Sequence, residues 1–250
     1  TTSAFVIAGA GITVAKHGNR SISSKTGSAD VLEHLGVSLF FSKEHIEELL
    51  RENQIAFLFA PHVHDKLKPF SKIRKELGLP TVFNVIGPLT NPVELDSQLI
   101  GVYRPELLPI IGESLVKIGR KRAVVINGAG GMDEASLAGV NQMLIIENGE
   151  TTRMTLHPND VNLPVYPNEA IRGGDAKENA QILLDVLRGK QGPYFDTVLL
   201  NAGLGLFANG VAQTIQDGIN MAKESILSGA AMEKLQNLVD YSRSINREVI

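Results

Sequence analysis

Residues 16–30 form an almost uninterrupted run of charged, hydroxyl and glycine residues. The segment before it, 12–15, is short and rich in β-branched residues, which is typical of a buried strand. The segment after it, 29–36, has apolar residues at helical spacing and ends at Gly36. A polar loop between a buried strand and a helix is where α/β proteins place anionic ligands, because backbone N–H groups point at the bound group. The run therefore predicts a phosphate-binding loop in an α/β protein.

The side chains of this loop are also suited to a phosphate ligand. Two of them are cations and four are hydroxyl donors: Lys16, Arg20, Ser21, Ser23, Ser24 and Ser28. The alternative interpretation is a solvated polar loop in which Ser28 caps the following helix. The residue types alone leave both interpretations open.

Charge and composition narrow the classes of function. A formal net charge of −3 argues against a generic nucleic-acid-binding surface, which would be basic. The sequence has no cysteine, which excludes disulfides and thiolate chemistry. No apolar run approaches the length of a membrane span. A local basic loop on a mildly acidic chain of 250 residues suits a small anionic ligand.

Strands and helices alternate along the rest of the chain. Apolar and β-branched runs predict strands at 55–59, 99–103 and 123–127, and a hairpin at 143–156 around Asn148-Gly149. Helical spacing predicts helices at 3–11, 43–53, 66–77, 105–119 and 175–187, and a helical segment over 194–247 that is interrupted near Gly210 and Gly229. This alternation predicts an α/β fold with a mainly parallel central sheet flanked by helices, in one domain over residues 1–250.

Asp133 and Glu134 follow the strand predicted at 123–127 and a glycine-rich turn. Such positions lie at the C-terminal edge of a parallel sheet, which is the usual ligand crevice. Two adjacent carboxylates suit Mg²⁺, which takes one or two carboxylates together with substrate phosphates and waters. The alternative is a pair of acids at a helix N-terminus, which the helix dipole favours. With a phosphate-binding loop expected at a neighbouring strand end, the metal site is the better interpretation.

Three other motifs are assigned no chemistry. The glycines of 128–131 do not have the spacing of a dinucleotide-binding loop. The side chains of His62 and His64 would diverge on a helix, and no third metal ligand is nearby. The glycines after Asn201 lie within a helical run, where they permit close packing.

The run from Lys16 to Arg20, followed by Ser-x-Ser-Ser-x-x-Gly-Ser-Ala-Asp, closely resembles the signature of the anthranilate phosphoribosyltransferases. Other motifs of that family recur in the same order, at 57–61, at 83–92 and at 131–134. The resemblance covers essentially the whole chain. It implies the large α/β domain of the nucleoside phosphorylase and phosphoribosyltransferase type.

This resemblance implies an activity and its requirements. The reaction is transfer of the phosphoribosyl group from phosphoribosyl pyrophosphate to anthranilate, with release of pyrophosphate, in tryptophan biosynthesis. The implied partners are these two small molecules, with neither nucleic acid nor a membrane. The full enzyme is expected to use two Mg²⁺ ions and to be a cytoplasmic homodimer.

The resemblance also assigns site residues. Asp133 and Glu134 match the pair that helps bind the second Mg²⁺ ion, while Asn19 and Arg74 match contacts to anthranilate. His17 is a candidate general base or else a structural histidine, and no catalytic residue is assigned beyond it. The residues implied to bind phosphoribosyl pyrophosphate are Thr1, Lys16, His17, Gly18, Asn19, Arg20, Ser21, Ile22, Ser23, Ser24 and Ser28.

The sequence departs from the family pattern in two places. The family places a Gly-Thr-Gly-Gly-Asp loop, a serine that binds the first Mg²⁺ ion and an N-terminal helical subdomain ahead of the position that Thr1 matches. We therefore expect residues 1–250 alone to have the fold with little or no turnover. The segment 62–68 also differs from the family's His-His-Pro-Ala-Met-Lys-like segment, which bears on the acceptor pocket.

Two other functions are compatible with part of these patterns. A pyrimidine nucleoside phosphorylase-like enzyme would use free phosphate and a nucleoside, and its signature would differ from that of Lys16 to Arg20. A non-catalytic relative that binds nucleic acid would need a basic surface and would show steep salt dependence. The net charge of −3 and the pair Asp133-Glu134 count against it.

Overall fold

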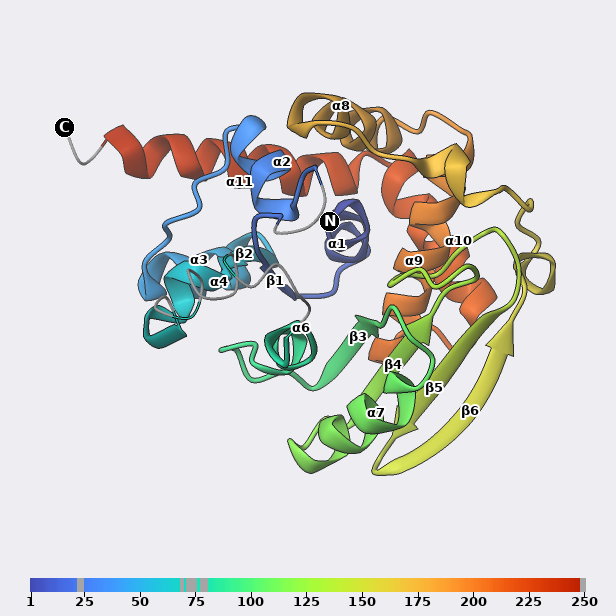
Figure 1. Cartoon of the computed structure of the whole chain (residues 1–250). Helices are drawn as coiled ribbons and strands as arrows, with labels where there is room; N and C mark the ends of the chain where they lie inside the picture. The colour runs from blue at the N-terminus through green and yellow to red at the C-terminus, as the bar shows by residue number, and fades with distance from the viewer. Residues whose placement is uncertain (22–24, 68–69, 71–75, 77–80, 248–250) are drawn as a thin grey trace. The chain divides into compact units, whose positions relative to one another are not determined.

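The computed structural model describes residues 1–21, 25–67, 70, 76 and 81–247 (Figure 1). Their strands form two sheets, one of two strands and one of four. The chain also groups into two compact units, the first made of residues 1–93, 173–188 and 229–250 and the second of residues 94–172 and 189–228. Helices accompany both sheets, so the predicted α/β class is confirmed. Compact units can be parts of one domain, and the single domain over 1–250 stays a prediction.

The first unit is built around a parallel pair of strands, β1 (Val14–Gly18) and β2 (Ile55–Phe59). All of β2 is buried, as expected of an unbroken apolar run in a parallel sheet. Helix α1 packs against α8 and α11, and α2 packs against α8. The helical elements of this unit are α1 (Thr2–Gly9), α2 (Ser28–His34), α3 (Lys43–Glu52), α4 (Ala60–Val63), η1 (Asp65–Leu67), α6 (Phe83–Ile86), η2 (Gly87–Leu89), α8 (Ala176–Leu187) and α11 (Ala230–Arg247).

The second unit contains a mixed sheet in the order β3-β4-β5-β6, whose strands lie side by side in Figure 1. Strand β3 (Ser97–Gly101) is parallel to β4 (Arg122–Asn127), while β5 (Asn141–Glu147) and β6 (Glu150–Leu156) add antiparallel pairs. Helices α7 and α9 both pack against β4, which is buried from Ala123 onward. The helical elements are α7 (Leu107–Lys117), η3 (Pro158–Val161), η4 (Asn168–Ile171), α9 (Pro193–Asn209) and α10 (Ile215–Leu227).

Local signals located most of these elements. Ser42 and Asp175 accept hydrogen bonds from His45 N–H (3.3 Å) and Glu178 N–H (2.9 Å), so both predicted helix starts are confirmed. The hairpin turn falls on Asn148-Gly149, both at positive φ. The strand expected at 99–103 begins and ends two residues earlier. The helix expected at 66–77 lies mostly outside the described residues.

The expected pairing of strands is corrected. The polar run and Asp133-Glu134 were predicted at neighbouring strand ends of one sheet, but β1 pairs with β2 and β4 pairs with β3 and β5 in a separate sheet. The hairpin supplies the antiparallel strands of that second sheet. Apolar periodicity locates strands but carries no information about which strand a given one pairs with.

Within the described ranges, no helix is long and apolar enough to cross a membrane.

Candidate functional site

The polar loop after β1 is closed by two glycines that have no room for a side chain. A Cβ on Gly18 would lie 2.6 Å from a ring carbon of Phe57, and a Cβ on Gly27 would overlap the backbone of residues 19–21. The Ala29 N–H donates to the Asn19 carbonyl at 3.3 Å. The loop therefore folds back from the end of β1 onto the start of α2.

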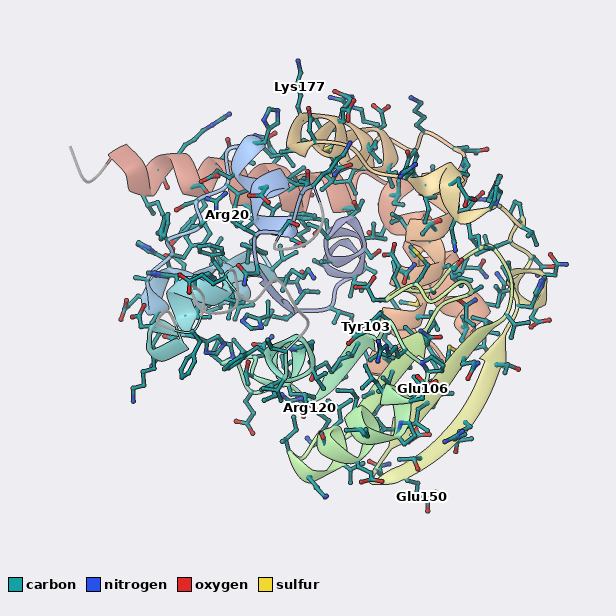
Figure 2. The ribbon with its side chains drawn as sticks, viewed as in Figure 1. Arg20, Tyr103, Glu106, Arg120, Glu150 and Lys177 are labelled. Carbon is teal, nitrogen blue, oxygen red and sulfur yellow. The ribbon has the colours of Figure 1, made fainter. Side chains whose placement is uncertain are left out.

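Arg20 ties this loop to α2 through two carboxylates. Its guanidinium donates to Asp30 at 2.8 Å and to both oxygens of Glu33 at 2.8 and 2.9 Å, and it lies over the Phe59 ring. Figure 2 shows Arg20 beside α2. The hydrogen bonds with Glu33 and Asp30 raise the pKa of Arg20, and the bond from Arg20 lowers the pKa of Glu33. The positive charge expected to face phosphate is thus already paired.

Asp30 completes the connection between the loop and α2. Its Oδ2 accepts the N–H groups of Gly27 (2.9 Å) and Ser21 (3.4 Å). Burial raises the pKa of Asp30, but the hydrogen bonds from Gly27 and Arg20 outweigh burial and lower it overall. Gly27 is the N-cap of α2, so the interpretation that Ser28 caps the helix is wrong. The Thr1 hydroxyl instead donates to the Ser28 hydroxyl at 2.6 Å, which joins two predicted substrate-binding residues.

His17 lies on β1 against a second histidine that the sequence reasoning had assigned no role. The rings of His17 and His64 are edge to face, with centroids 5.0 Å apart. The Nε2 atom of each ring is buried and has no hydrogen-bond partner among the residues that the structure describes. Burial is the main cause that lowers the pKa of His17 to about 4, and the charges of His64 and Lys16 lower it further. A hydrogen bond with the Gly87 backbone raises this pKa but does not outweigh them. The Nε2 atoms of both rings are therefore buried polar groups, and His17 is neutral near pH 7.

The other predicted substrate contacts are only partly described. Lys16 is half-buried in β1, and the exposed Asn19 accepts the Arg20 N–H through its Oδ1 at 2.7 Å. Four predicted site residues lie outside the described residues, namely Ile22, Ser23, Ser24 and Arg74.

Asp133 and Glu134 lie in the loop 128–136, which we call the carboxylate loop and which follows β4. The Gly128 N–H donates to the Met132 carbonyl at 2.8 Å, and Gly101 at the end of β3 packs directly on the Asp133 backbone. The pair therefore lies at the C-terminal end of β3 and β4, as predicted. Residues 135–140, all of which are described, form no helix, so the alternative of acids at a helix N-terminus is wrong.

The donor set of the carboxylate loop fits Mg²⁺. Asp133 and Glu134 are both exposed and offer hard carboxylate oxygens. Among the described residues, no group of three or more potential metal-ligating side chains occurs. Mg²⁺ is commonly bound by one or two carboxylates and otherwise by substrate phosphates and waters, which is the kind of coordination that such a pair permits.

The sequence reasoning missed the side chains that hold the carboxylate loop. Asn141, Asn168 and Asn201 each hydrogen-bond with its backbone. Two of them are fully or nearly buried, although asparagine is disfavoured in helix and strand interiors. The local signal in the sequence was Asn201, a polar residue within the otherwise apolar run 198–208.

Residues 1–232 match the family described as "Glycosyl transferase family, a/b domain". The chain is 59% identical over 249 residues to an anthranilate phosphoribosyltransferase of Oceanobacillus iheyensis, with 100% of this chain and 73% of that protein covered. Its fold is similar to that of a Thermus thermophilus anthranilate phosphoribosyltransferase, with a TM-score of 0.91 and 40% identity over 97% of this chain and 72% of the other. The Saccharomyces cerevisiae enzyme in complex with phosphoribosyl pyrophosphate and Mg is similar at a TM-score of 0.88 and 32% identity, over 97% of this chain and 69% of that one.

Proposed function

This chain belongs to the anthranilate phosphoribosyltransferase family, and from that premise we propose how its residues serve the reaction. The reaction transfers the phosphoribosyl group of phosphoribosyl pyrophosphate to the amine of anthranilate and releases pyrophosphate. One observation carries the proposal: the chain combines a polar loop closed by Gly18 and Gly27 with an exposed carboxylate pair at the end of β4. The polar loop is suited to binding an anion, and the carboxylate pair is suited to binding a hard cation.

The loop after β1 binds phosphoribosyl pyrophosphate. Lys16 supplies charge, and Ser21 and the Thr1–Ser28 hydroxyl pair supply donors. Arg20 acts mainly by holding the loop, because its guanidinium is already bonded to Asp30 and Glu33. The family pattern adds His17, Gly18, Asn19, Ile22, Ser23 and Ser24 to this set.

Asp133 and Glu134 hold one of two Mg²⁺ ions. Bound there, Mg²⁺ offsets the negative charge that develops on the pyrophosphate leaving group. The protein's own task is to present both carboxylates together at the end of β4, with the Asp133 backbone fixed against Gly101. Preorganised charge of this kind costs little reorganisation as the bond from the ribose carbon to the leaving oxygen breaks.

Anthranilate is positioned by Asn19 and Arg74. Its aromatic amine attacks as a neutral nucleophile, so the contribution of the protein is orientation rather than proton removal. A guanidinium fits the substrate carboxylate in a bidentate manner. With a pKa of about 4, His17 is a poor base near pH 7, which supports a hydrogen-bonding role.

The family resemblance further supports a cytoplasmic homodimer. Light scattering would measure the mass of the assembly and so test the homodimer.

Calorimetric titration with phosphoribosyl pyrophosphate tests this function. We expect Mg²⁺-dependent binding by the chain, and binding weaker by about tenfold or more in Asp133→Asn/Glu134→Gln. The matched control is Glu113→Gln/Glu150→Gln, which removes two exposed carboxylates of α7 and β6 in the same unit. Equal binding by the two double variants would contradict the metal assignment. Binding of free phosphate with a nucleoside in place of phosphoribosyl pyrophosphate would favour the phosphorylase alternative.

A further inference from the structure

Asn201, from a distant part of the chain, hydrogen-bonds the backbone N–H and carbonyl of the residue that follows the carboxylate pair. It lies in the middle of α9 and is 6% exposed. Its Oδ1 accepts the Ala135 N–H at 2.9 Å, and its Nδ2 donates to the Ala135 carbonyl at 2.9 Å. The same Nδ2 also donates to Thr197 one turn earlier. Ala135 follows Glu134 directly, so the side chain pairs with the loop as a neighbouring strand would.

Asn141 and Asn168 bind both ends of the same loop. Asn141, which is fully buried at the start of β5, accepts the N–H groups of Ser136 (2.7 Å) and Ala129 (3.4 Å). Asn168 of η4 donates to the Ala129 carbonyl at 2.9 Å and accepts the Ser136 hydroxyl at 2.6 Å. Ala129 and Ser136 stand on either side of the carboxylate pair, so the loop is fixed at both ends.

The chemistry of these side chains explains the choice of asparagine. A carboxamide donates and accepts at once, as a peptide does, and carries no charge. A lysine or arginine in the same place would attract Asp133 and Glu134 and compete with a cation for them. Neutral supports place no positive charge beside the carboxylate pair.

We propose that Asn141, Asn168 and Asn201 are positioning residues that preorganise the carboxylate loop for binding Mg²⁺. This inference rests on the proposed function, in which Asp133 and Glu134 hold the ion. Side chains that orient metal ligands without touching the metal commonly contribute ten- to a hundredfold to metal affinity. Here the supports act through the backbone on both sides of the ligands.

A purely structural role is the rival explanation, because a loop without regular structure must satisfy its buried peptide groups somehow. Both roles lower the free energy of unfolding when an asparagine is removed. Only a positioning role changes metal affinity in a protein that is still folded. Metal affinity is therefore the measurement that separates the two explanations.

The test uses Mn²⁺, whose free ion has a strong electron paramagnetic resonance signal, titrated with phosphoribosyl pyrophosphate present. The variants are Asn201→Ala and Asn168→Ala, and the second is only half-buried and so less disturbing to folding. We expect Mn²⁺ affinity to fall about tenfold in each variant. The control, Asn53→Ala, removes a similarly buried asparagine that donates to the Lys234 carbonyl in the first unit. It should lower the melting temperature and leave Mn²⁺ affinity within about twofold of wild type, as expected of a site that does not touch the metal loop.

Three outcomes decide the question. A tenfold loss in folded Asn168→Ala, with or without a folded Asn201→Ala, supports the inference. Wild-type affinity in the folded asparagine variants, together with loss of affinity in Asp133→Asn/Glu134→Gln, overturns the inference and leaves the proposed function standing. Unchanged affinity in Asp133→Asn/Glu134→Gln overturns the metal assignment and this inference with it.

Discussion

The two loops that carry the proposed chemistry are held in opposite ways. The loop after β1 is tied to α2 by an arginine between two carboxylates, with side chains that are 23% to 51% exposed. The carboxylate loop is held by uncharged asparagines, two of which are at most 6% exposed. The contacts that hold the loop after β1 are ionic and partly exposed to solvent. Those that hold the carboxylate loop are uncharged and mostly buried.

This difference follows the charge of what each loop is proposed to bind. A loop for phosphate tolerates carboxylates behind it when a cation offsets part of their charge, as Arg20 does for Asp30 and Glu33. A loop for a cation loses affinity if a fixed positive charge lies beside its ligands. Salt and pH should therefore act on the region around the first loop much more than on the carboxylate loop.

The largest expected effect comes from the feature that the loops share, which is a glycine packed on loop backbone. Gly101→Ala would place Cβ on the Asp133 carbonyl, and backbone cannot move aside as a side chain can. We expect a loss of about 3 kcal/mol in the free energy of unfolding, measured by urea denaturation. Gly119→Ala is the control, since only its positive φ of 83° disfavours alanine and no atom lies within 4 Å; it should cost about 1 kcal/mol. Equal losses of stability in Gly101→Ala and Gly119→Ala would show that the Asp133 backbone moves aside at little cost.

The second prediction concerns pH, which should act on the first unit through His17. Its pKa is lowered to about 4 in the folded protein, so folding favours the neutral ring. The contribution of His17 to stability is complete above pH 6.5 and is lost as pH falls toward 4. We expect the free energy of unfolding to drop about 2 kcal/mol more between pH 7 and pH 5 in wild type than in His17→Gln.

Asp30 and Glu33 do not confuse that comparison. Their pKa values are lowered, so the stability they contribute is present above their usual range near pH 4 and is lost only below it. The window between pH 7 and pH 5 therefore keeps Asp30 and Glu33 out of the comparison. The matched variant is His34→Gln, which removes an exposed histidine of the same unit. If the free energy of unfolding drops by the same amount in wild type and in His17→Gln, the loss of stability below pH 7 is not due to His17.

Local patterns predicted most of the elements and the approximate places of both loops. The strand expected at 12–15 is β1 (Val14–Gly18), so the first three residues of the predicted polar loop belong to the strand. The polar run could be recognised because a buried strand, a polar loop and a helix are contiguous in sequence. The position of Asp133 and Glu134 followed from the apolar strand and the glycine turn before them. Gly203 was assigned to close packing on similar grounds, and a Cβ there would indeed lie 2.7 Å from Ile219 of α10.

Contacts between distant residues could not be predicted in the same way. Asn201 and Ala135 are 66 residues apart, and Asn168 and Ala129 are 39 apart. Neither asparagine belongs to a sequence pattern from which its hydrogen-bond partner could be predicted. The same holds for the facing rings of His17 and His64, and for the division of the strands between two sheets. Pairing across the chain depends on packing of the whole fold, which one sequence does not display.

The smallest expected effect tests the ionic side of the comparison. Arg20→Gln removes the bonds to Asp30 and Glu33 but keeps a side chain that can hydrogen-bond. Because these pairs are partly solvated, we expect about 1 kcal/mol of stability to be lost at low salt, and less at 1 M salt, where screening already weakens the wild-type pairs. The loss in Asn201→Ala should be the same at both salt concentrations, since its contacts are neutral and buried. Urea denaturation of the three proteins at both concentrations measures this. If the losses in Arg20→Gln and Asn201→Ala respond equally to salt, the two loops do not differ in the way their contacts indicate.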